Sequence, residues 1–324
     1  MTITHSMIRI APALVLISLA ACGGDDKGSA TAGAPGKQTG SGTATAEQVA
    51  KEMRGKVKCP ARVATQRPAG SPVDDVVGVR PGMSWDEATN TVMCDNPLIV
   101  VSENTARGYN INTYGQTVRQ GFDAKFAEPR VVKTSEQIMA DMGEEFAARG
   151  GNAVIAPLKP GQLRYFVSTM GMPGQEKVVS VSREEYFADG KLPAIDDVKG
   201  ALITKYGEPS DVQNNGTHTY LWWNYAPNGS KLNSTSPLST TCRINVSPDA
   251  STNLSTECGL SVGALIQGAE SNPALAHSLA VTSQNGAAGY ALLTSTEEAL
   301  KSGDQARQSG ELAQAKKGAA KPKL

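Results

Sequence analysis

The amino-acid sequence predicts an α+β fold, with antiparallel sheets and a few packed helices. Strand-like segments alternate irregularly with helical ones, which favours antiparallel sheet over the regular alternation of a doubly wound α/β fold. Gly171-Met-Pro-Gly174 lies between two apolar runs and is a hairpin signal. Only 5% of the residues are aromatic, whereas 33 are glycine and 18 are proline, which is typical of a chain rich in loops.

Four helices are predicted from the signals at their ends. They cover about residues 45–54, 84–95, 134–149 and 194–206, and Gly207 lies where a left-handed C-terminal cap is expected. A weak, exposed helix is expected from about residue 294. The first three helices begin with capping boxes, in which a Ser or Thr is followed three residues later by Glu or Gln: Thr45 and Gln48, Ser84 and Glu87, Thr134 and Gln137.

Short apolar or alternating runs predict the strands. Residues 117–126 carry apolar side chains at a four-residue spacing, so this segment is also compatible with a helix. His277 is expected on a helix surface, and His218 is expected exposed on a strand. The predicted strands are residues 76–79, 98–102, 109–114, 117–126, 162–170, 176–182, 218–225, 242–246 and 258–266.

The chain divides into five parts by composition and pattern. The folded part is expected to consist of two α+β units, which could be two similar small units. The predicted parts are a signal peptide (1–21), a flexible tether (22–45), a first α+β unit (46–160), a second α+β unit (161–293) and a polar, largely disordered tail (294–324).

Charge and composition argue against several classes of function. Lys plus Arg and Asp plus Glu both number 31, and nucleic-acid binding needs an excess of basic residues, so no nucleic-acid partner is expected. Only three residues are histidine, which makes a histidine-based metal or catalytic cluster hard to build. No nucleophile elbow, zinc-protease motif or phosphate-binding loop occurs. We therefore predict no catalytic residues, no metal and no cofactor.

The N-terminus has the pattern of an export signal. An apolar run of about eleven residues, Ile10–Ala20, is too short to span a bilayer but suits a signal peptide. It ends in Leu19-Ala-Ala-Cys22-Gly23, which resembles the lipobox of bacterial lipoproteins. This resemblance implies cleavage before Cys22 and lipidation of its thiol; an ordinary signal peptide with a coincidental cysteine is the alternative.

The lipobox also implies a location. A lipidated Cys22 anchors the protein to a membrane of the bacterial cell envelope, facing the periplasm. The next residue, Gly23, is not the aspartate that retains lipoproteins in the inner membrane of enteric bacteria, so by this analogy the outer membrane is favoured. The low-complexity residues that follow, rich in Gly, Ala, Ser and Thr, predict the flexible tether.

The cysteines agree with an oxidising compartment. Apart from Cys22, the chain has four, an even number that allows three pairings. Cys59–Cys94 and Cys242–Cys258 are favoured, because each pair is close in sequence and lies within one predicted unit.

Two stretches of the chain have a similar order of elements. Val76–Val79 precedes the helix that opens at Gly82-Met-Ser84, and Val178–Val181 precedes the helix that ends at Tyr206-Gly-Glu-Pro209. An aromatic strand with Leu221-Trp-Trp223 follows the second helix. This pattern resembles envelope lipoproteins of the BamE (SmpA/OmlA) type, in which a Gly-Met-Ser/Thr start, a Leu-Gly-x-Pro end and a Trp/Tyr strand follow one another.

The resemblance is divided between two places and covers about 60 residues. The first helix ends at Cys94-Asp-Asn-Pro97 in place of Leu-Gly-x-Pro, and the second helix lacks the Gly-Met start. The family implies a role in protein–protein scaffolding in the envelope, without catalysis.

Side chains on the predicted strands are the candidates for binding. One of Trp222 and Trp223 is expected to face outward, where an exposed indole can bind a partner or a glycan; cross-strand packing under a loop is the alternative. Arg119, Arg164 and Arg183 either line an anionic pocket or pair with Asp and Glu across the sheet.

Two functions remain after these exclusions. The first is a non-enzymatic, membrane-anchored periplasmic lipoprotein that acts as an envelope scaffold or protein-interaction module, and it predicts an exposed aromatic patch. The alternative is a periplasmic protein that binds a small ligand or a glycan, or less plausibly a hydrolase. It predicts a concave pocket where Arg, Asp and aromatic groups converge, with at least one carboxyl of perturbed pKa.

Overall fold

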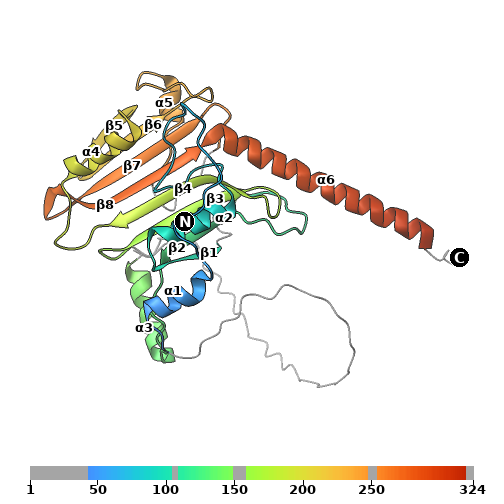
Figure 1. Cartoon of the computed structure of the whole chain (residues 1–324), viewed down its shortest axis with the longest axis horizontal. Coiled ribbons are helices and arrows are strands. Elements are labelled where there is room, and N and C mark those ends of the chain that lie inside the picture. Colours follow the sequence, from blue (N-terminus) through green and yellow to red (C-terminus); the bar gives the residue numbers. More distant parts are fainter. Residues whose placement is uncertain (1–42, 104–108, 149–157, 247–253, 319–324) are drawn as a thin grey trace, which may run out of the picture. The chain divides into compact units, whose positions relative to one another are not determined.

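A single antiparallel sheet forms the centre of the fold (Figure 1). The computed structural model describes residues 43–103, 109–148, 158–246 and 254–318. Within them, eight strands follow the order β1-β2-β3-β4-β8-β7-β6-β5, and the fold is α+β as the sequence predicts. The strands are β1 (Ile99–Glu103), β2 (Gly121–Phe126), β3 (Leu163–Met170), β4 (Lys177–Tyr186), β5 (Asp211–Asn215), β6 (His218–Asn224), β7 (Leu260–Ala269) and β8 (Asn272–Asn285).

The six helices of the described residues are distributed regularly among these strands. Four of them, α1, α2, α3 and α4, are close to the segments predicted as helices, and Thr45, Ser84 and Thr134 form the predicted hydrogen bonds with the residue three positions later. The helices are α1 (Ala46–Arg54), α2 (Trp85–Asp95), α3 (Ser135–Ala148), α4 (Ile195–Tyr206), α5 (Pro237–Thr241) and α6 (Gly286–Gly318).

The order of elements repeats along the chain. The first half runs α2-β1-β2-α3-β3-β4 and the second runs α4-β5-β6-α5-β7-β8. Each half contributes a four-stranded antiparallel meander, and the two meanders join where β4 pairs with β8. Each half is also closed by one of the two disulfides described below. The expectation of two similar units therefore has a counterpart in the topology, although both halves share one continuous sheet.

The boundary between the halves differs from the predicted one. The predicted boundary at residues 160 and 161 falls before β3, which pairs with β2 of the first half. The connection from β4 to α4, residues 187–194, is where the repeat of elements begins again. The described residues form one compact unit, because the pairing of β4 with β8 joins the two meanders in one sheet.

The two faces of the sheet are covered by different elements. Helix α2 packs on β1 and β4, and helix α4 packs on β7 and β8. The main core lies under them, with Tyr165, Trp223 and Ile266 fully buried. A shift of register in the β3–β4 pair lets Val178 and Val181 join this core, whereas Val179 packs with Leu300 of α6 in a separate cluster. The start of α6 therefore covers the opposite face.

Both favoured disulfides are present. Cys59 is bonded to Cys94 of α2, and Cys242 at the end of α5 is bonded to Cys258 just before β7. They close loops of 35 and 16 residues. In the chain-entropy model, such loops contribute roughly 3–4 kcal/mol each by restricting the unfolded chain.

Three predicted strands are absent. Residues 76–79 form a tight turn, in which Val76 and Val79 exchange backbone hydrogen bonds. Residues 109–114 have no strand pairing, and residues 242–246 follow the end of α5 as a loop. In each case a short apolar or alternating run is present, but no neighbouring strand pairs with its backbone groups, so the side-chain pattern alone did not predict a strand correctly.

The C-terminal third contains elements that the sequence analysis missed. Strands β5 and β8 were not predicted, and His277 lies on β8 where a helix surface was expected. Helix α6 begins at Gly286 and continues to Gly318, whereas a weak helix from 294 followed by disorder was expected. Its N-terminal turns are held against the sheet through Leu300 and its neighbours, which gives the helix tertiary support that the polar sequence does not reveal.

Candidate functional site

Helix α4 forms one wall of the candidate site. Asp196 and Asp197 lie in its first turn, where they favour the helix dipole. At its end Gly207 donates its backbone N–H to the carbonyl oxygen of Ile203. The buried positions Val198, Leu202 and Tyr206 recur every four residues, so one face of the helix packs against the sheet.

An apolar groove lies between this helix and the sheet. Its volume is about 430 Å³, which is within the range of small-molecule sites. Val198 and Leu202 of α4 line one side, and Leu279 and Val281 of β8 line the floor. Phe187, in the connection from β4 to α4, adds an aromatic side chain. The described residues that line the groove include no serine, cysteine or histidine.

Arg183 of β4 is the charged group at the floor of the groove. It is the cross-strand neighbour of Val281, and its side chain is 14% exposed. Its Nη1 atom donates to Glu185 at 2.7 Å, and its Nε atom lies 3.9 Å from an oxygen of Asp95. That Nε atom is buried and makes no hydrogen bond to any described residue. Arg183 is therefore held in place by Glu185 and Asp95, while its Nε–H group makes no hydrogen bond to a described residue.

Electrostatics keep Arg183 charged. Burial opposes its charge, but Tyr165, Glu185 and Asp95 together raise the pKa of its guanidinium group. The hydroxyl group of Tyr165 donates to Asp95 at 2.8 Å. Burial, together with this carboxylate, raises the pKa of Tyr165 far above that of an exposed tyrosine. The network thus presents a permanent cation beside an apolar cavity.

A tight turn closes the other side of the groove. Val76 and Val77 line the groove from this turn, and the turn is tied to α4 through Asp75. Lys205 donates to the Asp75 carboxylate at 2.8 Å, and the Tyr206 hydroxyl donates to the Asp75 carbonyl oxygen at 2.8 Å. Burial favours the neutral form of Asp75, but hydrogen bonds from Lys205 and from the Gly78 backbone prevail, and its pKa is lowered.

The turn is strained at its exposed position. Val77 has φ of +46° and Gly78 has φ of +83°, which is the backbone of a type I′ turn. A positive φ is unfavourable for a β-branched residue, whose Cβ crowds the following carbonyl group. Val77 is nevertheless 42% exposed, so its side chain gains little from burial. Strained residues of this kind cluster at functional sites.

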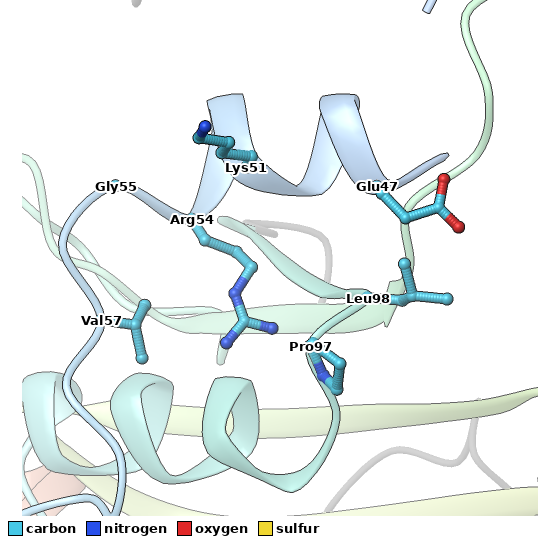
Figure 2. Close-up of a pocket in the computed structure, with 7 residues that line it drawn as sticks. All are labelled: Glu47, Lys51, Arg54, Gly55, Val57, Pro97 and Leu98. Atoms are coloured by element: carbon cyan, nitrogen blue, oxygen red, sulfur yellow. The ribbon is translucent and has the colours of Figure 1, made fainter. Parts of the chain in front are cut away.

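A second cavity, of about 580 Å³, lies beneath α1 (Figure 2). Arg54 reaches from α1 toward the turn before β1, and Lys51, one turn earlier on α1, also lines the cavity. The Arg54 guanidinium donates to the carbonyl oxygens of Met93 and Asn96 at 2.6 Å and more weakly to that of Ile99. It thereby satisfies carbonyl groups at the end of α2. Its donors are used for structure, so this cavity is the weaker candidate for a ligand site.

The two tryptophans do not form the exposed site that one alternative predicted. Trp223 is fully buried in the core and donates to the Gly207 carbonyl oxygen at 2.7 Å. Trp222 is 7% exposed, donates to the Ile244 carbonyl oxygen at 3.1 Å, and carries the Arg243 guanidinium over its ring. Residues 242–246, predicted as a strand, form a loop that covers Trp222. Trp222 is therefore packed under a loop, as the alternative interpretation of the sequence predicted.

The other candidate residues are distributed as follows. Arg164 pairs with Glu184 across the sheet, and Arg119 lies over the ring of Trp85, so of the three arginines only Arg183 lines the groove. His218 is half-buried and stacks beside Tyr220. Cys22 and the lipobox lie outside the described residues.

Arg183 was considered in the sequence, but its neighbours at the groove were not foreseen. They come from four separate segments, of which the turn with Val76 and Val77 lies more than 100 residues before Arg183, and a contact of this kind leaves no local signal. No three of the described His, Cys, Asp or Glu residues come together in a way that could hold a metal ion. None of the helices in the described ranges is long and apolar enough to span a membrane.

Comparison with known proteins places the chain in no group: no family model, curated protein or solved structure matches it.

Proposed function

We propose that this protein is a lipid-anchored protein of the bacterial cell envelope that binds a small amphipathic anion in the groove beside α4. The observation that carries the proposal is the combination of a cavity of about 430 Å³, apolar walls and the guanidinium of Arg183. It matches the pocket expected for the small-ligand alternative, with Arg, Asp and aromatic groups converging. Asp197 lines the groove, and Asp75, a carboxyl whose pKa is lowered, lies beside it in contact with the lining residues Lys205 and Tyr206.

The lining of the groove indicates the class of ligand. Apolar walls favour an apolar ligand body, since burial of apolar surface contributes roughly 25 cal/mol per Å². The guanidinium of Arg183 favours an acidic head group, because its positive charge attracts a carboxylate or a phosphate. A neutral glycan fits these walls poorly, because its hydroxyl groups would lose water without gaining partners.

The burial of both tryptophans weakens the case for the first predicted function, an envelope scaffold. That alternative predicted an exposed aromatic patch, and neither Trp222 nor Trp223 is accessible to a partner. We also propose binding in place of catalysis. The described lining residues include no serine, cysteine or histidine, and Lys205 and Tyr206 are both hydrogen-bonded to Asp75.

The envelope location is supported by the sequence and the disulfides. The lipobox-like Leu19–Gly23 predicts that Cys22 becomes a lipidated N-terminus, with the outer membrane favoured. Two disulfide bonds in the folded part suit an oxidising space such as the periplasm.

Titration with a fluorescent long-chain fatty acid tests the proposal. The test uses the chain from Gly23 onward, which retains every described residue and both disulfides. We expect saturable binding of the fatty acid and much weaker binding of the matched alcohol and amine. Ala201→Phe, which fills the groove from α4, is expected to reduce the affinity more than tenfold.

Thr204→Phe is the matched control, because Thr204 is exposed on the same helix and does not line the groove. It is expected to leave the affinity unchanged. Equal binding of fatty acid, alcohol and amine would contradict the role of Arg183. Retention of full affinity by folded Ala201→Phe would contradict the groove as the site.

A further inference from the structure

Positive charge is concentrated in a segment near the start of the described residues. Residues 51–67, here called the basic strap, contain six basic side chains and one acidic side chain, whereas the whole chain has equal numbers of each. The basic residues are Lys51, Arg54, Lys56, Lys58, Arg62 and Arg67.

The strap is held against α2 at three points along its length. Arg54 donates to backbone carbonyl oxygens at the end of α2. Cys59 is joined to Cys94 by a disulfide. Further along, the backbone N–H groups of Ala64 and Thr65 donate to the carboxylate of Glu87 at 2.6 and 2.7 Å. The strap therefore has a fixed position on the folded body, although it contains no regular structure after α1.

Five of the six basic side chains of the strap are exposed and form no ion pair with a described residue. Lys51, Lys56, Lys58, Arg62 and Arg67 are all exposed, and among the described residues none of them forms an ion pair. The one acidic residue of the strap, Glu52, pairs with Arg130 at 2.7 Å.

The nearby acidic side chains of α2 do not cancel this charge. Glu87 is occupied by hydrogen bonds from the strap backbone, and Asp95 accepts from Tyr165 on the sheet. Asp86 is the exposed exception. Five exposed basic groups thus remain along a stretch of chain that is tied to the folded part.

We propose that the basic strap binds the anionic phospholipid head groups of the membrane to which Cys22 is anchored. This inference rests on the lipid anchor in the proposed function. The strap begins in α1, the first described element after Cys22 in the sequence, so a lipid anchor at Cys22 keeps it within reach of the bilayer. Lys and Arg near an anionic bilayer contribute about 1 kcal/mol each, and salt weakens the attraction.

Such contact gives the anchored body a preferred orientation. The acyl chains hold the protein on the membrane, and the strap turns the α1 and α2 side of the fold toward the phosphate groups. Lys51 of α1 is exposed and belongs to this surface, whereas Arg54 donates to carbonyl oxygens at the end of α2 (Figure 2).

Vesicle flotation of the unlipidated chain from Gly23 onward tests the proposal independently of acylation. Vesicles contain either phosphatidylcholine alone or phosphatidylcholine with about one third phosphatidylglycerol. We expect binding to the second kind only, and loss of binding as salt is raised. The triple variant Lys56→Glu, Lys58→Glu and Arg62→Glu is expected to bind more than tenfold more weakly, since each charge acts separately.

The matched control has the same change of charge on α6: Lys301→Glu, Lys316→Glu and Lys317→Glu, all at exposed positions. It is expected to bind like the parent chain. Equal loss in both variants would overturn the proposal, as would failure of the parent chain to bind anionic vesicles or equal binding to both vesicle types.

Two further measurements distinguish loss of membrane binding from misfolding of the triple variant and from damage to its groove. Circular dichroism and the urea midpoint show whether the triple variant is folded. Titration with the fatty acid shows whether its groove is intact, because the strap does not line that groove. If anionic vesicles bind while Cys22 proves unmodified in cells, the strap remains a membrane-binding surface and only the anchor is wrong.

Discussion

At the scale of single residues, Val77 is the clearest conflict between local preference and observed structure. Its positive φ suits Asn or Gly, and Asn-Gly is the favoured pair for a type I′ turn. The neighbour that follows, Gly78, already fits, and its N–H donates to Asp75. Valine at this position gains little from packing because its side chain is 42% exposed. Its presence at the edge of the groove is explained if its apolar surface contacts the ligand.

Val77→Asn is therefore expected to stabilise the protein and weaken ligand binding. The relief of strain amounts to about 1 kcal/mol, which is the lower end of the cost of a left-handed conformation. Urea denaturation measures the change in the free energy of unfolding, and fatty-acid titration measures the affinity. Val77→Ala serves as the comparison, since it shortens the side chain without supplying the Asn-Gly pair. A destabilised Val77→Asn variant would show that the turn is not strained.

Glu87 combines two tasks at one carboxylate. It accepts from Ser84 in the capping box of α2 and from Ala64 and Thr65 of the basic strap. Burial favours its neutral form, but these hydrogen bonds prevail and lower its pKa from 4.5 to about 2. Because the folded-state pKa is depressed, the stabilisation is complete above pH 4.5 and is lost as the pH falls toward 2.

Glu87→Gln is expected to lower the free energy of unfolding at pH 7 by about 1 kcal/mol, a figure reduced for the partial exposure of this group. The difference between parent and variant should shrink as the pH falls from 4.5 to 2. Thermal unfolding at a series of pH values measures it. Asp86→Asn, at the exposed neighbouring position, controls for general loss of charge. A difference that does not change with pH would exclude the carboxylate as its source.

At the scale of elements, α6 has one end that packs and one end that does not. Leu300 is fully buried with Val118, Met170 and Val179, whereas Leu312 further along is 57% exposed. Local ion pairs support the exposed end, where Arg307 contacts Asp304 and Glu311. The helix therefore depends on the part around Leu300 for its tertiary support, since most helical stability in proteins comes from tertiary packing.

Leu300→Ala is expected to cost about 3 kcal/mol of stability, through the lost burial and the cavity that remains. Leu312→Ala, the same change on the exposed part of the helix, is expected to cost less than about 0.5 kcal/mol. Urea denaturation of both variants checks this contrast. Equal effects of the two changes would mean that α6 does not pack on the sheet as described.

At the scale of the whole molecule, the proposal joins an anchor, a basic surface and a binding groove. Lipidation at Cys22 is the part on which the membrane location depends. Intact-mass analysis of the protein from bacterial envelopes should show a chain that starts at Cys22 with added diacylglycerol and acyl mass. Cys22→Ala should abolish incorporation of labelled palmitate and leave the disulfides intact. A mature chain without acyl groups would remove the anchor from the account.

Interactions between residues that are close in sequence could be predicted from the sequence. The three capping boxes join residues only three positions apart, so Ser84 and Glu87 could be recognised from their spacing. The same holds for the hairpin of β3 and β4, and for the favoured pairing of Cys242 with Cys258. Local geometry dictates these features, and the sequence alone was sufficient for them.

Features that depend on distant pairing were settled only in the tertiary structure. Strand β8 is recognisable because β4 and β7 pair with both its edges, and Trp222 is covered because the loop after Cys242 folds over it. The groove brings Val77, Arg183 and Leu279 together across about 200 residues of chain. Sequence spacing carries no signal of such contacts, because they arise only when the two halves share one sheet.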